Sequence, residues 1–368
     1  MVANSRWLVF FATIMLIAGS VFACKVPVFR FALERWPADN YRVVAITDGD
    51  QSDETKEAIA TLHALAESPA NVEIEVVDLQ KLTDAQLWQV EGLEDTADAP
   101  LLQVFFPQRE GQRELCWSGK LTKANVDAWG DSPLRKRIAS DIQSGVSAVW
   151  VVVEGADAKA NQQLSSDLQT ALEEATKQIA IPDGVIKRED ASRYLAEHKG
   201  ASMDDVLRSN LPLKIQFTVQ TLSHKDQEEL AVAAMIGAFA NVEDAPFVFP
   251  VFGRGRMIEP LSAQRLGSAA IVGACQYMVG ECSCVVKTMN PGVDLILNTD
   301  WQQSLGDEIV LVDVPIDPNP QLLPIPGGAS ETLEPESTIT GNSAITVVAL
   351  GVGIAVVVLL VTRTRQSR

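Results

Sequence analysis

Asp98-Ala-Pro-Leu-Leu-Gln-Val-Phe-Phe106 carries the strongest fold signal in the chain, because Asp244-Ala-Pro-Phe-Val-Phe-Pro-Val-Phe252 repeats its pattern. In both stretches the tripeptide Asp-Ala-Pro opens an apolar run with the length of a buried strand. The elements predicted on either side of the two stretches follow one another in the same order. A repeat at matching places indicates two copies of one α/β unit.

The first copy covers residues 41–142, and alternation of apolar and polar residues marks its strands. In chain order we predict a strand at 41–47, a helix at 52–68, a strand at 72–78, a helix at 84–93, strands at 101–106 and 112–117, and a closing helix at 121–142. Pro27 opens a further short helix, which we expect to lean on this first copy.

The second copy covers residues 147–280 and contains a charged, predicted helical insertion at about 181–210. In chain order we predict a strand at 147–153, a helix at 157–179, a strand at 213–219, a helix at 226–240, a strand at 247–252, a turn at 253–256 and a closing helix at 261–278. A helix at 293–305 and a short strand at 307–314 are expected to follow.

The order β-α-β-α-β-β-α resembles the thioredoxin fold, in which a proline that is usually cis begins the third core strand. Pro100 and Pro246 fall at that place, and X-Pro bonds adopt the cis form at modest cost. The alternative is two unrelated α/β units. Active thioredoxins carry Cys-X-X-Cys after the first strand, whereas residues 48–53 and 154–158 contain no cysteine. We therefore expect modules kept for binding or spacing, without dithiol exchange.

The two ends of the chain predict export and membrane anchoring. Residues 1–23 resemble a cleaved signal peptide, with an uncleaved second anchor as the alternative. Cys24 then stands where a bacterial lipobox places its lipidated cysteine; alternatively, it is simply the first residue of the mature chain. The uncharged run 344–362 has the length of one transmembrane helix, and the three arginines of the tail 363–368 favour a cytoplasmic C-terminus.

These features predict an ordered set of regions. They are a signal peptide (1–23), a first thioredoxin-like domain with the N-terminal helix (24–145), a second with the insertion (146–284), a C-terminal extension (285–314), a Pro-, Ser- and Glu-rich tether (315–343), a transmembrane helix (344–362) and a basic tail (363–368).

Three clustered cysteines are the strongest candidates for chemistry: Cys275, Cys282 and Cys284. In an exported protein, thiols this close are expected to be oxidised or bound to metal. A disulfide from Cys275 to Cys282 or Cys284 would be a structural staple. Redox exchange, or a site for copper(I) or zinc, would use the same sulfur atoms. Cys116 is interpreted as an inert core residue or as a partner for Cys24.

Two arginines are candidates for contacting an anion, and the net charge limits the class of partner. In Gly253-Arg-Gly-Arg256, the guanidinium groups of Arg254 and Arg256 could contact an anion, although a hairpin turn also explains both glycines. The chain has 48 acidic and 30 basic residues, a net charge of −18, which argues against binding to nucleic acid. No sequence motif indicates a cofactor.

The chain also resembles a group of uncharacterised exported membrane proteins of planctomycete bacteria. The resemblance rests on the stretches 24–36 and 252–256 and on Cys282-Ser-Cys284 followed by Asn290-Pro-Gly-Val-Asp294. It implies a bacterial cell envelope and no particular activity. We expect a single-pass, non-catalytic binding or scaffolding protein with its body outside the cell membrane and a protein partner in the envelope. The alternative is a thiol-redox or soft-metal protein that acts through the three clustered cysteines.

Overall fold

The computed structural model describes most of the chain between the two predicted membrane segments. The described residues are 24–49, 52–82, 98–108, 114–198, 202–223, 225–262, 267–282 and 287–306. The predicted signal peptide, tether, transmembrane run and tail lie outside them, as do Cys284, the helix at 84–93 and the strand at 307–314. Within the described ranges, no helix has the length and apolar character that a membrane crossing requires. The described part is of the mixed α/β class.

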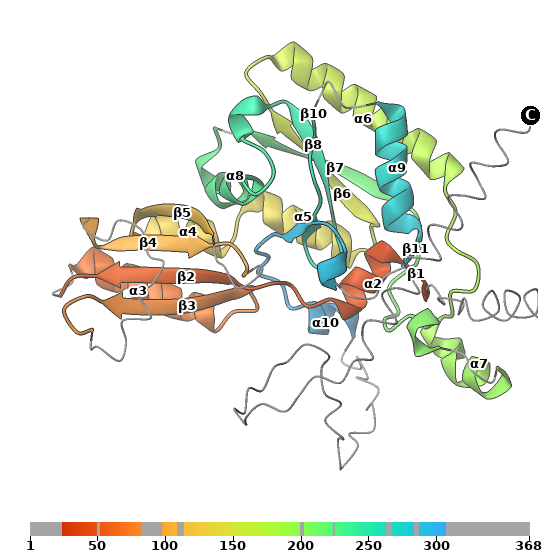
Figure 1. Ribbon diagram of the computed structural model, residues 1–368, viewed down its shortest axis with the longest axis horizontal. Coiled ribbons are helices and arrows are strands. Elements are labelled where there is room, and N and C mark those ends of the chain that lie inside the picture. Colours follow the sequence, from red (N-terminus) through yellow and green to blue (C-terminus); the bar gives the residue numbers. More distant parts are fainter. Residues whose placement is uncertain are drawn as a thin grey trace, which may run out of the picture. The chain divides into compact units, whose positions relative to one another are not determined.

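The first module (residues 41–143) contains a four-stranded sheet in the order β3-β2-β4-β5 (Figure 1). Strand β2 is parallel to β3 and antiparallel to β4, and β4 is antiparallel to β5. The elements are β2 (Tyr41–Thr47), α3 (Asp53–Ala66), β3 (Val72–Asp78), β4 (Leu101–Phe105), β5 (Leu115–Lys120), α4 (Lys123–Gly130) and α5 (Pro133–Gln143).

Two predictions for the first module are wrong in detail. The predicted strand at 112–117 lies at Leu115–Lys120, because pairing with β4 determines its register. The predicted closing helix at 121–142 is two helices, α4 and α5. The break falls where the Ser132 hydroxyl accepts a bond from the backbone N–H of Arg135 and Pro133 occupies the first turn of α5, both of which are signals that start a new helix.

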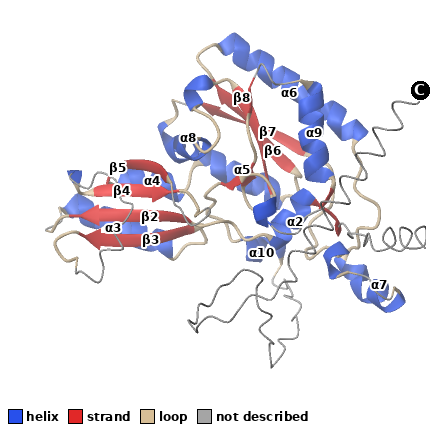
Figure 2. Cartoon of the chain, viewed as in Figure 1, coloured by secondary structure: helices blue, strands red, loops and turns tan. Residues whose placement is uncertain are grey.

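The second module (residues 148–305) repeats this strand pairing in a larger sheet (Figure 2). Strand β6 is parallel to β7 and antiparallel to β8, β8 is antiparallel to β9, and β12 extends the sheet beyond β9. Its strands are β6 (Ala148–Glu154), β7 (Phe217–Ser223), β8 (Phe247–Phe252), β9 (Arg256–Met257), β10 (Leu261–Ser262), β11 (Glu281–Cys282) and β12 (Val293–Asp294). Its helices are α6 (Ala158–Gln178), α7 (Ala191–Glu197), α8 (Leu230–Ile236), α9 (Ser268–Val279) and α10 (Trp301–Leu305).

Three predictions for the second module also differ from the structure. The predicted strand at 213–219 lies at 217–223, and the predicted helix at 261–278 begins at Ser268, after the short strand β10. The predicted helix at 293–305 is helical only at Trp301–Leu305. Its first part is extended because β9 captures it: the Leu295 N–H donates to the Gly255 carbonyl.

The insertion at 181–210 is only partly helical. It contains α7 and two single 3₁₀ turns, at Arg188–Asp190 and Met203–Asp205. Similar turns lie at Gln227–Glu229, Val242–Asp244 and Lys287–Met289. No residue of α7 is buried. The insertion therefore contributes one exposed α-helix, and the expectation of a mainly helical insertion is wrong for its described residues.

The N-terminal segment packs on the second module, whereas we expected it to lean on the first. It consists of β1 (Cys24–Pro27), which pairs antiparallel with β11, and α2 (Val28–Arg35). Its side chains share an apolar cluster with alternate residues of β6, Trp150 and Val152, and with α6 and α9. The segment thus packs, together with α6 and α9, on one face of the second sheet.

The other face of the second sheet shares a core with the first module. Val149 and Val151 of β6 belong to the same buried cluster as Val43 of β2 and Trp129 of α4. Polar contacts also cross between the modules, since Glu229 accepts a bond from the Ser132 hydroxyl at 2.6 Å. Successive side chains of a strand point to opposite faces of the sheet. Strand β6 therefore contributes residues to both clusters and connects the N-terminal segment with the common core.

Candidate functional site: the N-terminal clasp and its cysteines

The loop after β6 lies against one of the two cis peptide bonds of the described chain, Ala245–Pro246; the other is Ala99–Pro100. A Cβ atom added at Gly155 would lie 2.5 Å from the Ala245 carbonyl oxygen, so glycine is required for this approach. The Asn161 side chain accepts from the Gly155 N–H at 2.9 Å and donates to the Gly155 carbonyl at 3.0 Å. The side chain of Asn161 therefore closes the loop, and the residues in contact there carry no thiol.

The corresponding loop of the first module is also held by its own chain. Gly49 has a φ of +81°, and its N–H donates to Asp78 at 3.1 Å. A hydrogen bond from Lys81, followed by the Gly49 and Gln80 N–H groups, lowers the pKa of the Asp78 carboxyl. The described residues of this loop contain no cysteine.

Three cysteines of the second module and its N-terminal strand share one apolar cluster. Cys24, Cys275 and Cys282 are 4%, 0% and 1% exposed, and all three belong to the cluster beneath α2. Cys24 and Cys282 are directly opposite each other in the pairing of β1 with β11. The spacing in the sequence predicts Cys275 and Cys282 as candidates, but it does not indicate that Cys24 lies opposite Cys282.

The structure contains these residues, and Cys116, as thiols. Neither the expected Cys275–Cys282 staple nor a Cys24–Cys116 bond is present among the described residues. Cys116 packs against the core shared by the modules, while Cys24 lies in the cluster beneath α2, so their sulfur atoms occupy separate cores. This separation excludes a bond between them in the folded chain.

Burial disfavours the thiolate form of Cys24, Cys275 and Cys116. Burial raises the pKa of Cys24 to about 11 and that of Cys275 to about 12, and it raises the pKa of Cys116 as well. The reactive and metal-ligating form is the thiolate, which these surroundings disfavour. Across the described ranges, no three His, Cys, Asp or Glu side chains group in a way that could hold a metal ion.

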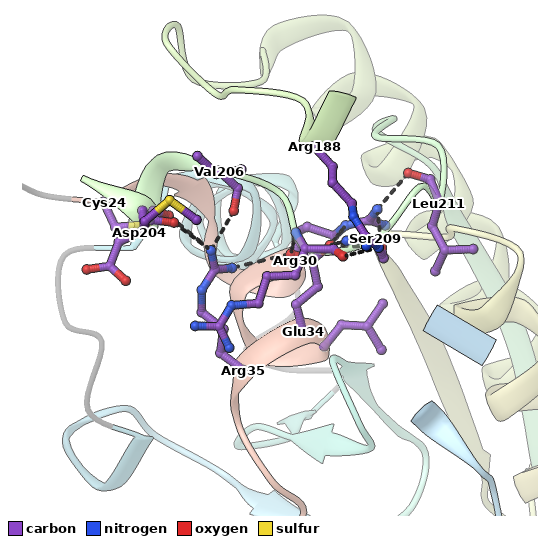
Figure 3. A network of polar contacts seen from close by, with 12 residues as sticks. Cys24, Arg30, Glu34, Arg35, Arg188, Asp204, Val206, Ser209 and Leu211 are labelled. Carbon is purple, nitrogen blue, oxygen red and sulfur yellow. Dashed lines mark hydrogen bonds and ion pairs between the residues drawn. The ribbon is translucent and has the colours of Figure 1, made fainter. Parts of the chain in front are cut away.

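A buried ion pair fastens α2 to the insertion. We call β1, α2 and the facing stretch 202–211 the N-terminal clasp (Figure 3). Glu34, which is 2% exposed, accepts from Arg30 Nε at 2.8 Å and from the backbone N–H of Ser209 at 3.1 Å. The Arg30 guanidinium also donates to the Leu211 carbonyl at 2.6 Å. The pair therefore determines where the insertion returns to the body of the molecule.

Two further contacts complete the clasp (Figure 3). The Arg35 guanidinium donates to the Val206 carbonyl at 2.6 Å and lies over the Phe31 ring at 4.6 Å. The Cys24 thiol donates to the Asp204 carbonyl at 2.9 Å. A lipid chain on this sulfur would replace that bond, and lipidation of Cys24 stays a prediction.

The predicted anion contacts are occupied by the chain itself. Arg254 Nε donates to the Leu33 carbonyl at 2.8 Å. Arg256 is 5% exposed, donates to the Asn290 carbonyl at 2.7 Å and pairs with Asp294. The hairpin interpretation of this stretch is confirmed, because Phe252 and Arg256 pair across it. Both guanidinium groups donate to protein oxygens, and a contact of Arg254 or Arg256 with an anion stays a prediction.

Sequence reasoning missed the buried charges of the clasp and of the turn. Arg30 and Glu34 have the i, i+4 spacing of a helical ion pair, but such pairs usually face solvent. Asp294 gave no signal, although it is 2% exposed and also pairs with Lys287.

No protein-family model matches the chain. No curated protein matches it either.

Proposed function

We propose that this chain is a membrane-anchored, extracytoplasmic binding or scaffolding protein of the bacterial cell envelope, built from two thioredoxin-like modules without dithiol chemistry. Strand pairing supports the choice of fold. In each module the first two strands are parallel and the next two are antiparallel additions on the other side, the arrangement expected of a β-α-β-α-β-β-α thioredoxin-like unit.

The observation that carries the proposal is the closed loop beside Pro246. A thioredoxin presents its dithiol beside the cis-proline, at the start of the helix after the first strand. Here Gly155 contacts the Ala245–Pro246 bond, and Asn161 occupies the polar backbone groups of Gly155. With no cysteine in this loop, the module would retain a binding framework without the exchanging group.

The shared core supports a scaffolding role. Buried residues of both modules form one cluster, and Glu229 joins it by accepting bonds from Ser132 and the Leu134 N–H. Relative motion of two modules is expected unless their interface is large and apolar. A common core therefore presents the surfaces of both modules to a partner as one body.

The sequence supports the membrane and its orientation. The run 344–362 is uncharged and long enough for one helix, and Arg363, Arg365 and Arg368 follow it. The acidic composition keeps the body soluble outside the membrane and argues against nucleic acid as a partner. The partner we propose is a protein of the envelope or membrane.

Thiol–disulfide turnover tests the non-catalytic part of the proposal. The full chain, purified in mild detergent, is added to insulin and dithiothreitol, and insulin reduction is followed by turbidity. We expect insulin reduction to be no faster with the wild type or with Cys282→Ser than it is without the protein. Faster reduction that Cys282→Ser abolishes would overturn the proposal in favour of a redox protein.

Protease accessibility tests the location. Intact bacterial cells that express the full chain with a C-terminal tag are treated with protease. We expect loss of the described body and protection of a short tagged fragment. Protection of the whole chain, or release of the body by washing without protease, would contradict a single-pass protein with an outward body.

A further inference from the structure

We propose that Cys24 and Cys282 form a disulfide that fastens the N-terminal strand to the second module. The proposal goes beyond the scaffolding role and concerns a bond that neither sequence spacing nor the missing thioredoxin dithiol suggests. It starts from one observation, the pairing of Cys24 with Cys282 across β1 and β11.

The backbone geometry suits such a bond. Directly opposite residues of an antiparallel pair have Cα atoms about 4.5–5.5 Å apart. Disulfides in proteins join Cα atoms about 4.4–6.8 Å apart. Opposite side chains also leave the same face of the pair, and both of these belong to the apolar cluster beneath α2.

The surrounding contacts hold the two strands together, although their register shifts between Cys24 and Pro27. At the far end of β1, the Val28 N–H donates to the Gly280 carbonyl at 3.1 Å. Beside Cys24, the Lys25 N–H donates to the Asp205 carboxylate at 2.8 Å, and the Lys25 amine pairs with Glu281. These bonds all lie on the C-terminal side of Cys24 along β1, and closing the sulfur bridge would replace the bond from the Cys24 thiol to the Asp204 carbonyl.

Formation of the bond is a two-electron oxidation. Both thiols lose a proton and together two electrons, and one S–S bond forms. The oxidant is a disulfide, from a small molecule or an oxidoreductase, which takes up the electrons and is cleaved to two thiols through a mixed disulfide. The thiolate is the attacking form, and burial raises the pKa of Cys24 to about 11. Exchange is therefore expected mainly before β1 docks.

The bond would make the N-terminal segment a permanent part of the second module. Without it, β1 is held by a two-stranded pairing and by contacts to the insertion. With it, the loop from residue 24 to residue 282 is closed covalently, which restricts the unfolded chain. Cys275 lies in the same cluster and is the competing partner for Cys282.

Disulfide mapping tests the proposal. The full chain in mild detergent is refolded with oxidised glutathione as the oxidant, quenched in acid, alkylated in denaturant and digested for mass spectrometry. We expect a peptide pair that joins Cys24 to Cys282 and the loss of two of the five thiols on titration. The link should persist in Cys116→Ser and Cys284→Ser and be lost in Cys282→Ser.

Three results would overturn it: a bond from Cys282 to Cys275 or Cys284 instead, five remaining thiols after oxidation, or a lipid mass on the Cys24 peptide. Mapping in the wild type and in Cys284→Ser decides the question even if Cys282→Ser fails to fold. The insulin assay measures exchange chemistry and the mapping identifies which cysteines are joined, so the two proposals are tested by different readouts.

Discussion

The two modules share their strand pairing and differ in what surrounds it. In the first module the sheet ends at the half-exposed strands β3 and β5. In the second, β12 lengthens the sheet, and β1, α2 and the insertion cover one of its faces. The Arg30–Glu34 ion pair lies in this covering, and three of the four described cysteines belong to the apolar cluster beneath it. The two modules therefore share a framework of paired strands, and the elements that distinguish them surround the second copy.

The comparison separates two sources of stability. The first module depends on apolar burial in the shared core, as its β2 is wholly buried. The clasp of the second module adds buried charges that are stable only when fully paired. Removing one partner of the buried ion pair in the clasp should therefore strongly lower the free energy of unfolding. Equivalent substitutions in the repeated framework should lower it by similar amounts in both modules.

The largest effect is expected from Glu34→Ala. The substitution leaves the Arg30 guanidinium buried without its carboxylate and removes an acceptor from the Ser209 N–H. Breaking a buried pair in this way costs about 3–5 kcal/mol. Urea unfolding of the full chain, followed by tryptophan fluorescence, measures the loss.

Glu281→Ala is the matched control, because Glu281 pairs with Lys25 of the clasp and this ion pair is exposed. We expect its unfolding midpoint to stay at the wild-type value. Equal effects of the two substitutions would show that burial of the Arg30–Glu34 pair is unimportant, and that the covering of the second module is not held by paired charge.

The next effect is expected from Gly155→Ala. Its Cβ would meet the Ala245 carbonyl at 2.5 Å, and overpacking of this kind costs about 1–3 kcal/mol. Gly273→Ala is the control, since it lies within α9 with no atom within 4 Å of its Cβ, and alanine favours helix. A neutral Gly155→Ala in thermal unfolding would mean that the loop after β6 is open enough to hold other groups.

Alkaline pH should weaken the second module under reducing conditions. The pKa of Cys275 is raised from 9.0 to about 12, so its burial as a thiol stabilises the fold fully below pH 9. Above pH 9 the unfolded chain ionises first, and this contribution is lost as the pH rises towards 12. The loss is at most about 1.4 kcal/mol per pH unit.

Cys275→Ala isolates that contribution. Its unfolding free energy, measured with reductant between pH 8 and about 10, should fall less steeply with pH than that of the wild type. Parallel slopes would indicate that Cys275 is accessible to water in the folded chain.

The smallest effects should be equal in the two modules. Ser52 caps α3 by accepting from the Thr55 N–H, and Asp157 caps α6 by accepting from the Lys159 and Ala160 N–H groups. Replacing either cap with alanine costs about 1 kcal/mol. Chemical denaturation of Ser52→Ala and Asp157→Ala tests whether corresponding helices contribute equally; a clear difference would limit the repeat to strand pairing.

Local patterns predicted the repeated framework but not its surroundings. The runs after Pro100 and Pro246 predicted β4 and β8, since continuous apolar residues suit a buried strand. The register of β5 and β7 was misplaced by a few residues, because partner strands determine it. The N-terminal segment was assigned to the wrong module, because chain neighbours were assumed to be neighbours in space.

The candidate site shows the same limit. Cys275 and Cys282 attracted attention through spacing, whereas the pairing of Cys24 with Cys282 depends on strands more than 250 residues apart, from position 24 to position 282. Arg256 was interpreted as an anion contact because its partner Asp294 lies on another strand. Contacts between distant parts of the chain carry this information, and no local pattern contains it.

Calorimetry tests most directly whether the two modules form one body that can act as a scaffold. The shared core predicts that the full chain, in mild detergent, shows one heat-capacity transition for its folded body, with equal calorimetric and van't Hoff enthalpies. Gly155→Ala should lower the temperature of that single transition. Two separate transitions, with only one displaced by Gly155→Ala, would contradict a common core and leave two independent modules.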